Sequence, residues 1–237
     1  MDYLEERPTR PEGTALYYAV LCGFSGLADY LITTHGEDVN AKCGEHGSPL
    51  HAASYKGHLD AARVLLAHRV NMNTTSKNDR TPLCSAYDGG HLDVMRLLLE
   101  RGADVDVYYD LAGLLSHEAS FRGRVDVVHL LLQHSADVNA RNSSNETPLH
   151  TASIRGETRV AQLLLEHGAI INAQSVSHST PLYRASEYGY LEVVQVLLRH
   201  GADVHIRGEE DQTPFRVATS KGYVKVAQLL LEHSAEY

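Results

Sequence analysis

The sequence predicts an all-α solenoid, in which short helix–turn–helix units stack one upon the next. Two observations lead to this prediction. A motif related to Thr-Pro-Leu recurs with a period of 33 residues. Each occurrence is followed by an Ala five residues later and a Gly nine residues later, without exception. Self-similarity at a fixed period of this length is typical of repeat architectures, which grow by adding units rather than by enlarging one core.

The repeats divide the chain. Their expected starts are Thr14, Ser48, Thr81, Leu114, Thr147, Thr180 and Thr213. The first start precedes the second by 34 residues, so one extra residue is expected near Thr33 to Glu37. We therefore expect a tail over residues 1–12 and one repeat array over residues 13–237.

Each repeat contains signals for two helices. The starting Thr can cap a helix, and the Pro after it suits the first helical turn, where its missing N–H is not needed. The Ala allows a neighbouring helix to approach closely, and the Gly is expected to end the helix in a left-handed turn. A second helix follows, as in residues 92–99, where one narrow polar stripe (Asp93, Arg96, Glu100) predicts a broad buried face. Its leucines are interpreted as core residues.

The fourth and second repeats depart from this pattern. Leu114 and Leu115 replace the cap and the Pro of the fourth repeat, so we expect it to be the least stable internal repeat. Burial of Leu111, Leu114 and Leu115 could offset the loss, or Asp110 could cap an earlier start. In the second repeat, Arg69 stands where Gly is usual, which leaves the end of its second helix open.

Composition restricts the partners. The formal net charge of −9 and the lack of a basic cluster argue against nucleic acid and anionic membranes. The longest apolar run, Ala15 to Cys22, is too short to span a bilayer, and the charged residues 1–13 do not resemble a secretory signal. Three cysteines form no disulfide framework. We expect a cytoplasmic or nuclear monomer.

No catalytic or metal-binding motif is present. His117-Glu118 begins a zinc-protease-like string, but Phe121 stands where its second His belongs. Cys43, His46 and His51 match no standard metal spacing. Because His51, His117 and His150 occupy one repeat position, we interpret them as structural hydrogen-bonding residues at helix ends. The sequence therefore predicts no enzyme activity, no cofactor and no metal.

These motifs resemble the ankyrin repeat: Thr-Pro-Leu-His, a Gly nine residues on, a leucine triplet, then Gly-Ala-Asp-Val-Asn. The resemblance covers nearly the whole chain and extends to the ankyrin tails of large fungal signalling proteins with nucleotide-binding domains. It implies helix–turn–helix pairs joined by β-hairpin-like fingers in a curved solenoid. It also implies a scaffold that binds a partner protein on its concave face without catalysis. A non-catalytic targeting or autoinhibitory part of a larger signalling enzyme, and a purely structural array, are the alternatives.

In the ankyrin family, partner-binding residues lie on the fingers and on the exposed side of the first helices. Transferred by position, the helix residues are Tyr55, Lys56, Phe121, Arg122, Ile154, Arg155, Glu187 and Tyr188, and the finger residues are Lys77 and Arg80. Aromatic residues and Arg are enriched at binding hot spots. Arg122 and Arg155 predict a basic spot that faces an acidic segment of the partner.

Overall fold

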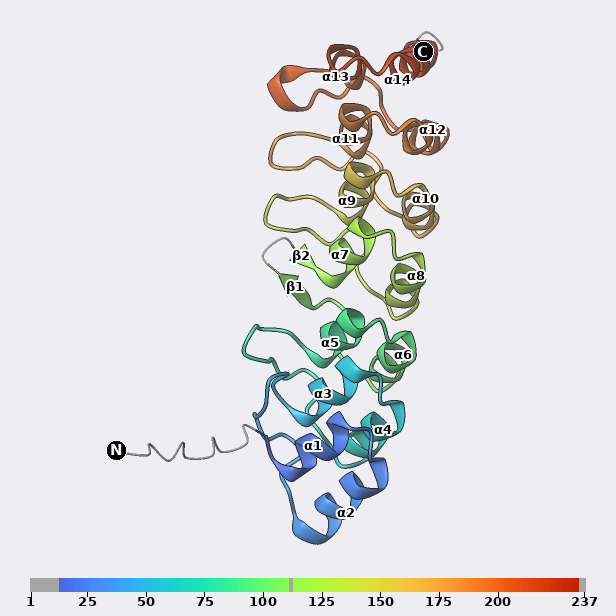
Figure 1. Cartoon of the computed structure of the whole chain (residues 1–237). Coiled ribbons are helices and arrows are strands. Elements are labelled where there is room, and N and C mark those ends of the chain that lie inside the picture. Colours follow the sequence, from blue (N-terminus) through green and yellow to red (C-terminus); the bar gives the residue numbers. More distant parts are fainter. Residues whose placement is uncertain (1–12, 111–112, 235–237) are drawn as a thin grey trace, which may run out of the picture. The chain divides into compact units, whose positions relative to one another are not determined.

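The computed structural model describes residues 13–110 and 113–234. Within these ranges it contains fourteen α-helices, a two-stranded antiparallel sheet and one 3-10 turn (Figure 1). The first helices of the pairs are α1 (Ala15–Leu21), α3 (Pro49–Lys56), α5 (Pro82–Gly89), α7 (Leu115–Phe121), α9 (Pro148–Arg155), α11 (Pro181–Tyr188) and α13 (Pro214–Ser220). The second helices are α2 (Ser25–His35), α4 (Leu59–Ala67), α6 (Leu92–Glu100), α8 (Val125–Gln133), α10 (Thr158–Glu166), α12 (Leu191–Arg199) and α14 (Val224–Ser234). The predicted all-α solenoid of helix pairs is confirmed, while the predicted tail, residues 1–12, lies outside the described residues.

The chain forms two compact units, up to Asp104 and from Val105 onward. In the N-terminal unit, α1, α3 and α5 pack along one another, and α2, α4 and α6 form a second layer. In the C-terminal unit, α7, α9, α11 and α13 form one layer, and α8, α10, α12 and α14 form the other (Figure 1). No helix of the described residues is long and apolar enough to cross a membrane.

The first helices pack closely against their neighbours because each presents a small, buried Ala to them. The Ala of the repeat motif is at most 3% exposed in every first helix, and Leu50, Leu83, Leu149 and Leu182 are fully buried beside it. Fully burying one leucine side chain contributes about 1.5–3 kcal/mol. The repeated apolar positions therefore supply the stability of the stack.

Polar side chains start the first helices as predicted. The hydroxyl of Thr14, Ser48, Thr81, Thr180 and Thr213 accepts a hydrogen bond from the backbone N–H three residues later. Helix α2 has 11 residues where α4 has nine, while the one extra residue near Thr33 to Glu37 stays a prediction. Arg69 adopts the left-handed conformation at φ 57°, so it takes over the role of the usual Gly.

Two sets of side-chain hydrogen bonds connect helix pairs and fingers that lie about one repeat period apart in the sequence. The imidazole Nε2 of His51, His117 and His150 bonds to the backbone carbonyl oxygen of Arg80, Glu146 and Ser179, at 2.9–3.0 Å. Asn or Asp side chains accept from a backbone N–H 31 residues later. The acceptor–donor pairs are Asn40–Asn71, Asn73–Asp104, Asp106–Asp137, Asn139–Ile170 and Asn172–Asp203. The predicted structural role of the three histidines is confirmed.

The loops between helix pairs are hairpin-like fingers. In five of them, a backbone N–H bonds to the carbonyl oxygen four residues later, at 2.6–3.0 Å. The donors are Cys43, Ser76, Asn142, Ser175 and Gly208. The finger before α7 forms a true hairpin, in which β1 (Tyr108–Asp110) pairs with β2 (Gly113–Leu114). The last finger carries the 3-10 turn Glu209–Asp211.

The fourth repeat starts at Leu114 without a side-chain cap. Asp110 lies in β1, so the alternative of an earlier helix start capped by Asp110 is wrong. Leu115 is fully buried, and its backbone N–H bonds to the carbonyl oxygen of Val107 at 2.9 Å. Leu114 is half-buried, and Leu111 lies outside the described residues. Since Leu114 has no hydroxyl, the buried Nδ1 of His117 lacks the partner that Ser48 provides for His51.

The Gly of the repeat motif meets two demands. All seven such glycines have φ between 66° and 80°, which confirms the predicted left-handed turn. A ring from the next repeat also packs against several of them. A Cβ on Gly57, Gly156 or Gly189 would lie within 2.5 Å of the ring of His91, Tyr190 or Tyr223, respectively. The Gly therefore sets both the turn and the contact between repeats.

We predict that Gly156→Ala destabilises the protein more than Gly168→Ala. Both residues have positive φ, 74° and 88°, so both changes carry a backbone cost of about 1 kcal/mol or more. A Cβ at Gly168 has no atom within 4 Å, whereas one at Gly156 collides with Tyr190. Chemical denaturation measures the difference. Equal losses would mean that Tyr190 moves aside without cost.

We predict that Leu114→Thr stabilises the protein by about 0.5–2 kcal/mol, the range of a helix cap. The new hydroxyl would accept from the His117 backbone and give the buried His117 Nδ1 a partner. Leu114→Val is the matched control, because Val has the shape of Thr without the hydroxyl. Faster amide exchange in residues 115–120 than in residues 149–154 of the unmodified protein would support the same explanation. If the Thr and Val variants unfold at the same denaturant concentration, the missing hydroxyl is not a weakness.

Candidate interaction surface

The predicted binding residues lie at the C-terminal ends of the first helices. They occupy the last turn or the residue after it, just before the left-handed Gly. Tyr55, Lys56, Phe121, Arg122, Arg155 and Tyr188 are exposed, whereas Ile154 and Glu187 are half-buried. This exposure follows from helix geometry, because the Ala two residues before each pair faces the neighbouring helices.

Finger side chains reach these helix ends within single repeats. In the N-terminal unit, the ring of His46 stacks on Tyr55 at 4.6 Å between centroids, and Lys56 Nζ lies 5.4 Å from the same ring. Arg80 binds Asp88 at the end of α5, at 2.9 Å. In the C-terminal unit, the Arg122 guanidinium lies 6.0 Å from the ring of Tyr109. Fingers and helix ends therefore form a shared surface within each unit.

The sequence did not anticipate the role of His46. Its ring lies on Tyr55, and burial lowers its pKa, with Lys56 adding to the effect and Glu45 opposing it. Lys77 is exposed on the next finger, where it lines a small hollow with Lys42 and Ser76. The N-terminal unit thus combines one aromatic cluster at Tyr55 with cationic groups on its fingers.

In the C-terminal unit, aromatic and cationic groups follow one another along the helix ends. The guanidinium of Arg155 lies over the ring of Phe121, at 4.7 Å from its centroid. The ring of Tyr190 covers Gly156, the residue next to Arg155. Tyr188 then stacks on Tyr190, with centroids 6.3 Å apart. The structure therefore brings Phe121, Arg155 and Tyr188 onto one surface, together with Tyr190.

Besides Arg80, two further predicted residues are held in ion pairs. Arg122 binds Glu118 on its own helix. Glu187 binds Arg184 at 3.0 Å, and Arg184 also contacts Glu146 and Glu209 from two fingers, at 3.6 and 3.0 Å. Burial alone would lower the pKa of Arg184, but these carboxylates outweigh burial and raise it. Sequence reasoning missed Arg184 because two of its three partners lie on fingers, 38 residues before it and 25 residues after it.

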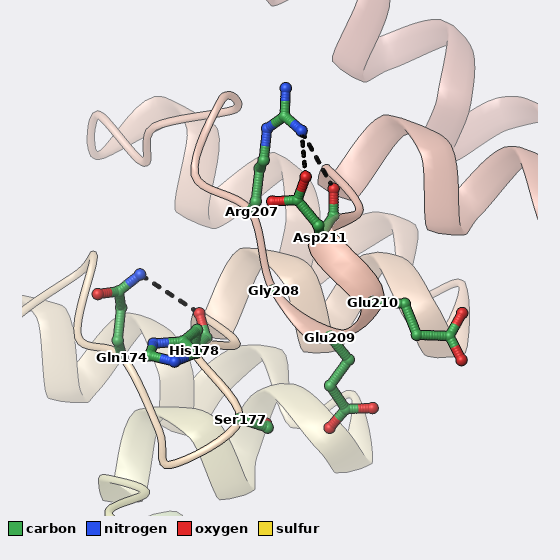
Figure 2. A pocket seen from close by; sticks show the side chains of 8 residues that line it. All are labelled: Gln174, Ser177, His178, Arg207, Gly208, Glu209, Glu210 and Asp211. Carbon is green, nitrogen blue, oxygen red and sulfur yellow. Dashed lines mark hydrogen bonds and ion pairs between the residues drawn. The ribbon is translucent and has the colours of Figure 1, made fainter.

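An open hollow lies beside this ion-pair cluster (Figure 2). Its lining comes from two fingers of the C-terminal unit, with Gln174, Ser177 and His178 on one and residues 207–211 on the other. Figure 2 shows Arg207 bound to Asp211, and the side chains of Glu209 and Glu210 directed away from that pair. The hollow offers hydrogen-bonding and acidic groups to a polar ligand.

The histidines of the repeat motif are engaged in structural hydrogen bonds. His150 is fully buried, its Nδ1 accepts from the Thr147 backbone N–H at 3.0 Å, and its Nε2 bonds to the Ser179 carbonyl. Burial lowers the pKa of His150 to about 4, against the opposing effect of the Ser179 hydrogen bond. Burial lowers the pKa of His51 and His117 as well. These rings are therefore neutral at pH 7.

The candidate metal ligands have other partners. Cys43 Sγ contacts the carbonyl oxygen of Ala41, His46 lies on Tyr55, and His51 is held between Ser48 and Arg80. Among the described residues, no group of three His, Cys, Asp or Glu side chains is arranged to hold a metal ion.

Stacked helix pairs with fingers and an exposed row of aromatic and charged groups define a helical-repeat binding module. The family model for ankyrin repeats in three copies matches residues 16–109 and again residues 116–208. The chain therefore belongs to the ankyrin repeat family, whose domains are in general protein–protein interaction modules. The pair α13 and α14 lies beyond the matched residues, so its assignment as a further repeat remains a prediction.

Solved structures agree with this assignment. The ankyrin repeat domain of Bcl-3, a member of the IkappaB protein family, has a TM-score of 0.83 and 28% identity; the match covers 92% of this chain and all of that one. The ankyrin repeat domain of human ASB11 has a TM-score of 0.76 and 27% identity, and the match covers 93% and 98% of the two chains. The search of curated proteins found no match.

We predict that stability falls as the pH is lowered from 7 to 5. An imidazole in the unfolded chain titrates near 6.5, while folded His150 resists protonation down to about pH 4. Below pH 6.5 the unfolded state therefore binds more protons, which costs the folded state on the order of 1–2 kcal/mol by pH 5. His150→Gln should be less stable at pH 7 and less sensitive to pH. Parallel curves of melting temperature against pH for the two proteins would contradict this.

Proposed function

We propose that this chain is a non-catalytic scaffold that binds a partner protein on the surface formed by its fingers and the ends of its first helices. The observation that supports this most directly is the series of contacts in the C-terminal unit in which Arg155 lies over Phe121, Tyr190 lies against the adjacent Gly156, and Tyr188 stacks on Tyr190. Aromatic residues and Arg dominate the energetics of protein interfaces. They lie here in exposed or half-buried positions.

The layer of second helices differs from the layer of first helices in the type of side chain that it exposes. The exposed positions of the second helices are mostly charged or amide residues, such as Arg96 on α6 and Gln195 on α12. Charged and flexible side chains of this kind are depleted at the centres of interfaces. The difference between the two layers supports a binding role for the first-helix side.

Absence of catalysis is part of the proposal. Efficient acid–base catalysis needs a titratable group whose pKa lies near the working pH and which can reach a substrate. The most strongly shifted histidine, His150, is fully buried and has both ring nitrogens in hydrogen bonds to the backbone. The proposed function is therefore recognition, in which the stacked helix pairs hold a row of side chains that differ from repeat to repeat.

A partner captured with the full chain allows the surface to be tested. Phe121→Ala, Arg155→Ala and Tyr188→Ala should each weaken its binding by about 1 kcal/mol or more, because they truncate exposed hot-spot types. Isothermal titration calorimetry measures the affinities, and thermal unfolding checks that the variants remain folded. Tyr55→Ala and Lys56→Ala test the N-terminal unit in the same way.

Arg96→Ala and Gln195→Ala are the controls, since both residues are exposed on second helices. Neither control should change the affinity. If the controls weaken binding while the first-helix variants do not, the binding surface lies on the other layer of the solenoid.

A further inference from the structure

Five exposed or half-buried residues of the C-terminal unit form a stripe whose one arginine has no ion-pair partner among the described residues. We define the aromatic stripe as Phe121, Ile154, Arg155, Tyr188 and Tyr190. Its contacts run from Phe121 to Arg155, past Gly156 to Tyr190, and on to Tyr188. Phe121 and Tyr188 are 38% and 46% exposed, so apolar surface remains open to a ligand on both sides of Arg155.

Arg155 differs from the other arginines near the stripe. Arg122 binds Glu118, and Arg184 binds Glu146, Glu187 and Glu209. In the described part of the chain, no carboxylate lies within ion-pair distance of Arg155, whose guanidinium contacts the ring of Phe121 instead. Glu187, the carboxylate within the same row of helix ends, is already engaged by Arg184.

The Phe121 ring prepares Arg155 for a ligand. A guanidinium that lies over an aromatic ring keeps its N–H groups in the plane of the fork free to donate. Because the guanidinium already rests against the ring, fewer side-chain conformations have to be given up on binding. A planar carboxylate is the group that matches this fork with two parallel hydrogen bonds.

We propose that the aromatic stripe binds an acidic segment of another protein. An Asp or Glu carboxylate of that segment bonds to Arg155, and apolar residues beside it pack on Ile154 and Tyr188. This inference rests on the proposed function and goes beyond it by assigning the partner's chemistry. Charge complementarity supports it, because Arg155 is the exposed cation of the stripe that lacks a carboxylate within the described residues.

Selection from a random library tests the proposal before any partner has been identified. Phage-displayed random twelve-residue peptides are selected on the immobilised full chain, and the enriched peptides are synthesised with a fluorescent label. Fluorescence anisotropy then gives their affinities for the unmodified chain and for Arg155→Gln, Arg155→Lys and Arg159→Gln. Arg159 is the matched control, an exposed arginine on α10 outside the stripe.

The enriched peptides should contain an excess of Asp and Glu. Arg155→Gln should weaken their binding roughly tenfold or more, as expected for the loss of a charge-assisted hydrogen bond. Arg155→Lys should recover only part of this loss, because Lys keeps the charge without the fork. Arg159→Gln should have no effect. Replacing the acidic residues of an enriched peptide by their amides should reproduce the effect of Arg155→Gln.

The measurements distinguish a failure of the acidic-segment inference from a failure of the proposed function. Peptides that lose affinity with Phe121→Ala or Tyr188→Ala but not with Arg155→Gln would overturn the acidic-segment inference and leave the proposed surface intact. Peptides that are insensitive to all stripe variants would overturn both. A selection that enriches no peptide, or enriches basic peptides, would also contradict an acidic ligand at Arg155.

Discussion

Side-chain hydrogen bonds to backbone groups about one repeat period ahead hold the helix pairs and fingers of each unit in register. His51, His117 and His150 reach a carbonyl 29 residues ahead, and Asn or Asp side chains accept from an N–H 31 residues ahead. Apolar burial is non-directional and would allow the helix pairs to slide. The polar bonds are directional, and the histidine rings that make one set of them are buried, so misplacing them would leave polar groups unsatisfied. The histidine bonds fix the position of a finger relative to the helix pair that precedes it.

The position of the fingers in turn produces the surface. Once the Arg80 backbone is held by His51, its side chain can bind Asp88 at the end of α5. The left-handed glycines also shape this surface, because the absence of a Cβ at Gly156 lets Tyr190 approach the turn that follows Arg155. Residues that fix the backbone, such as Gly156, therefore lie next to candidate binding residues, such as Arg155.

Two arginines of the C-terminal unit, Arg184 and Arg155, have different electrostatic surroundings. Arg184 is 15% exposed in its side chain and has three carboxylates around it, so removing one partner would leave charge poorly compensated in a partly buried place. Arg155 lies on a ring instead of a carboxylate, and its charge remains available. The same residue type is thus held by carboxylates in one place and by an aromatic ring in the other, and the proposed recognition role falls to the second.

The sequence by itself determined the helix pairs, their caps, the left-handed glycines and the structural histidines, because these depend on local spacing and on the 33-residue period. It also placed the candidate residues at the helix ends. The tertiary structure decided that Arg122 pairs with Glu118 while Arg155, among the residues described, lies on a ring instead of a carboxylate, and that His46, Tyr190 and Arg184 belong beside the surface. Apart from the Arg122–Glu118 pair within one helix, those contacts join finger to helix or helix pair to helix pair, and side-chain packing across such distances has no periodic signal in the sequence.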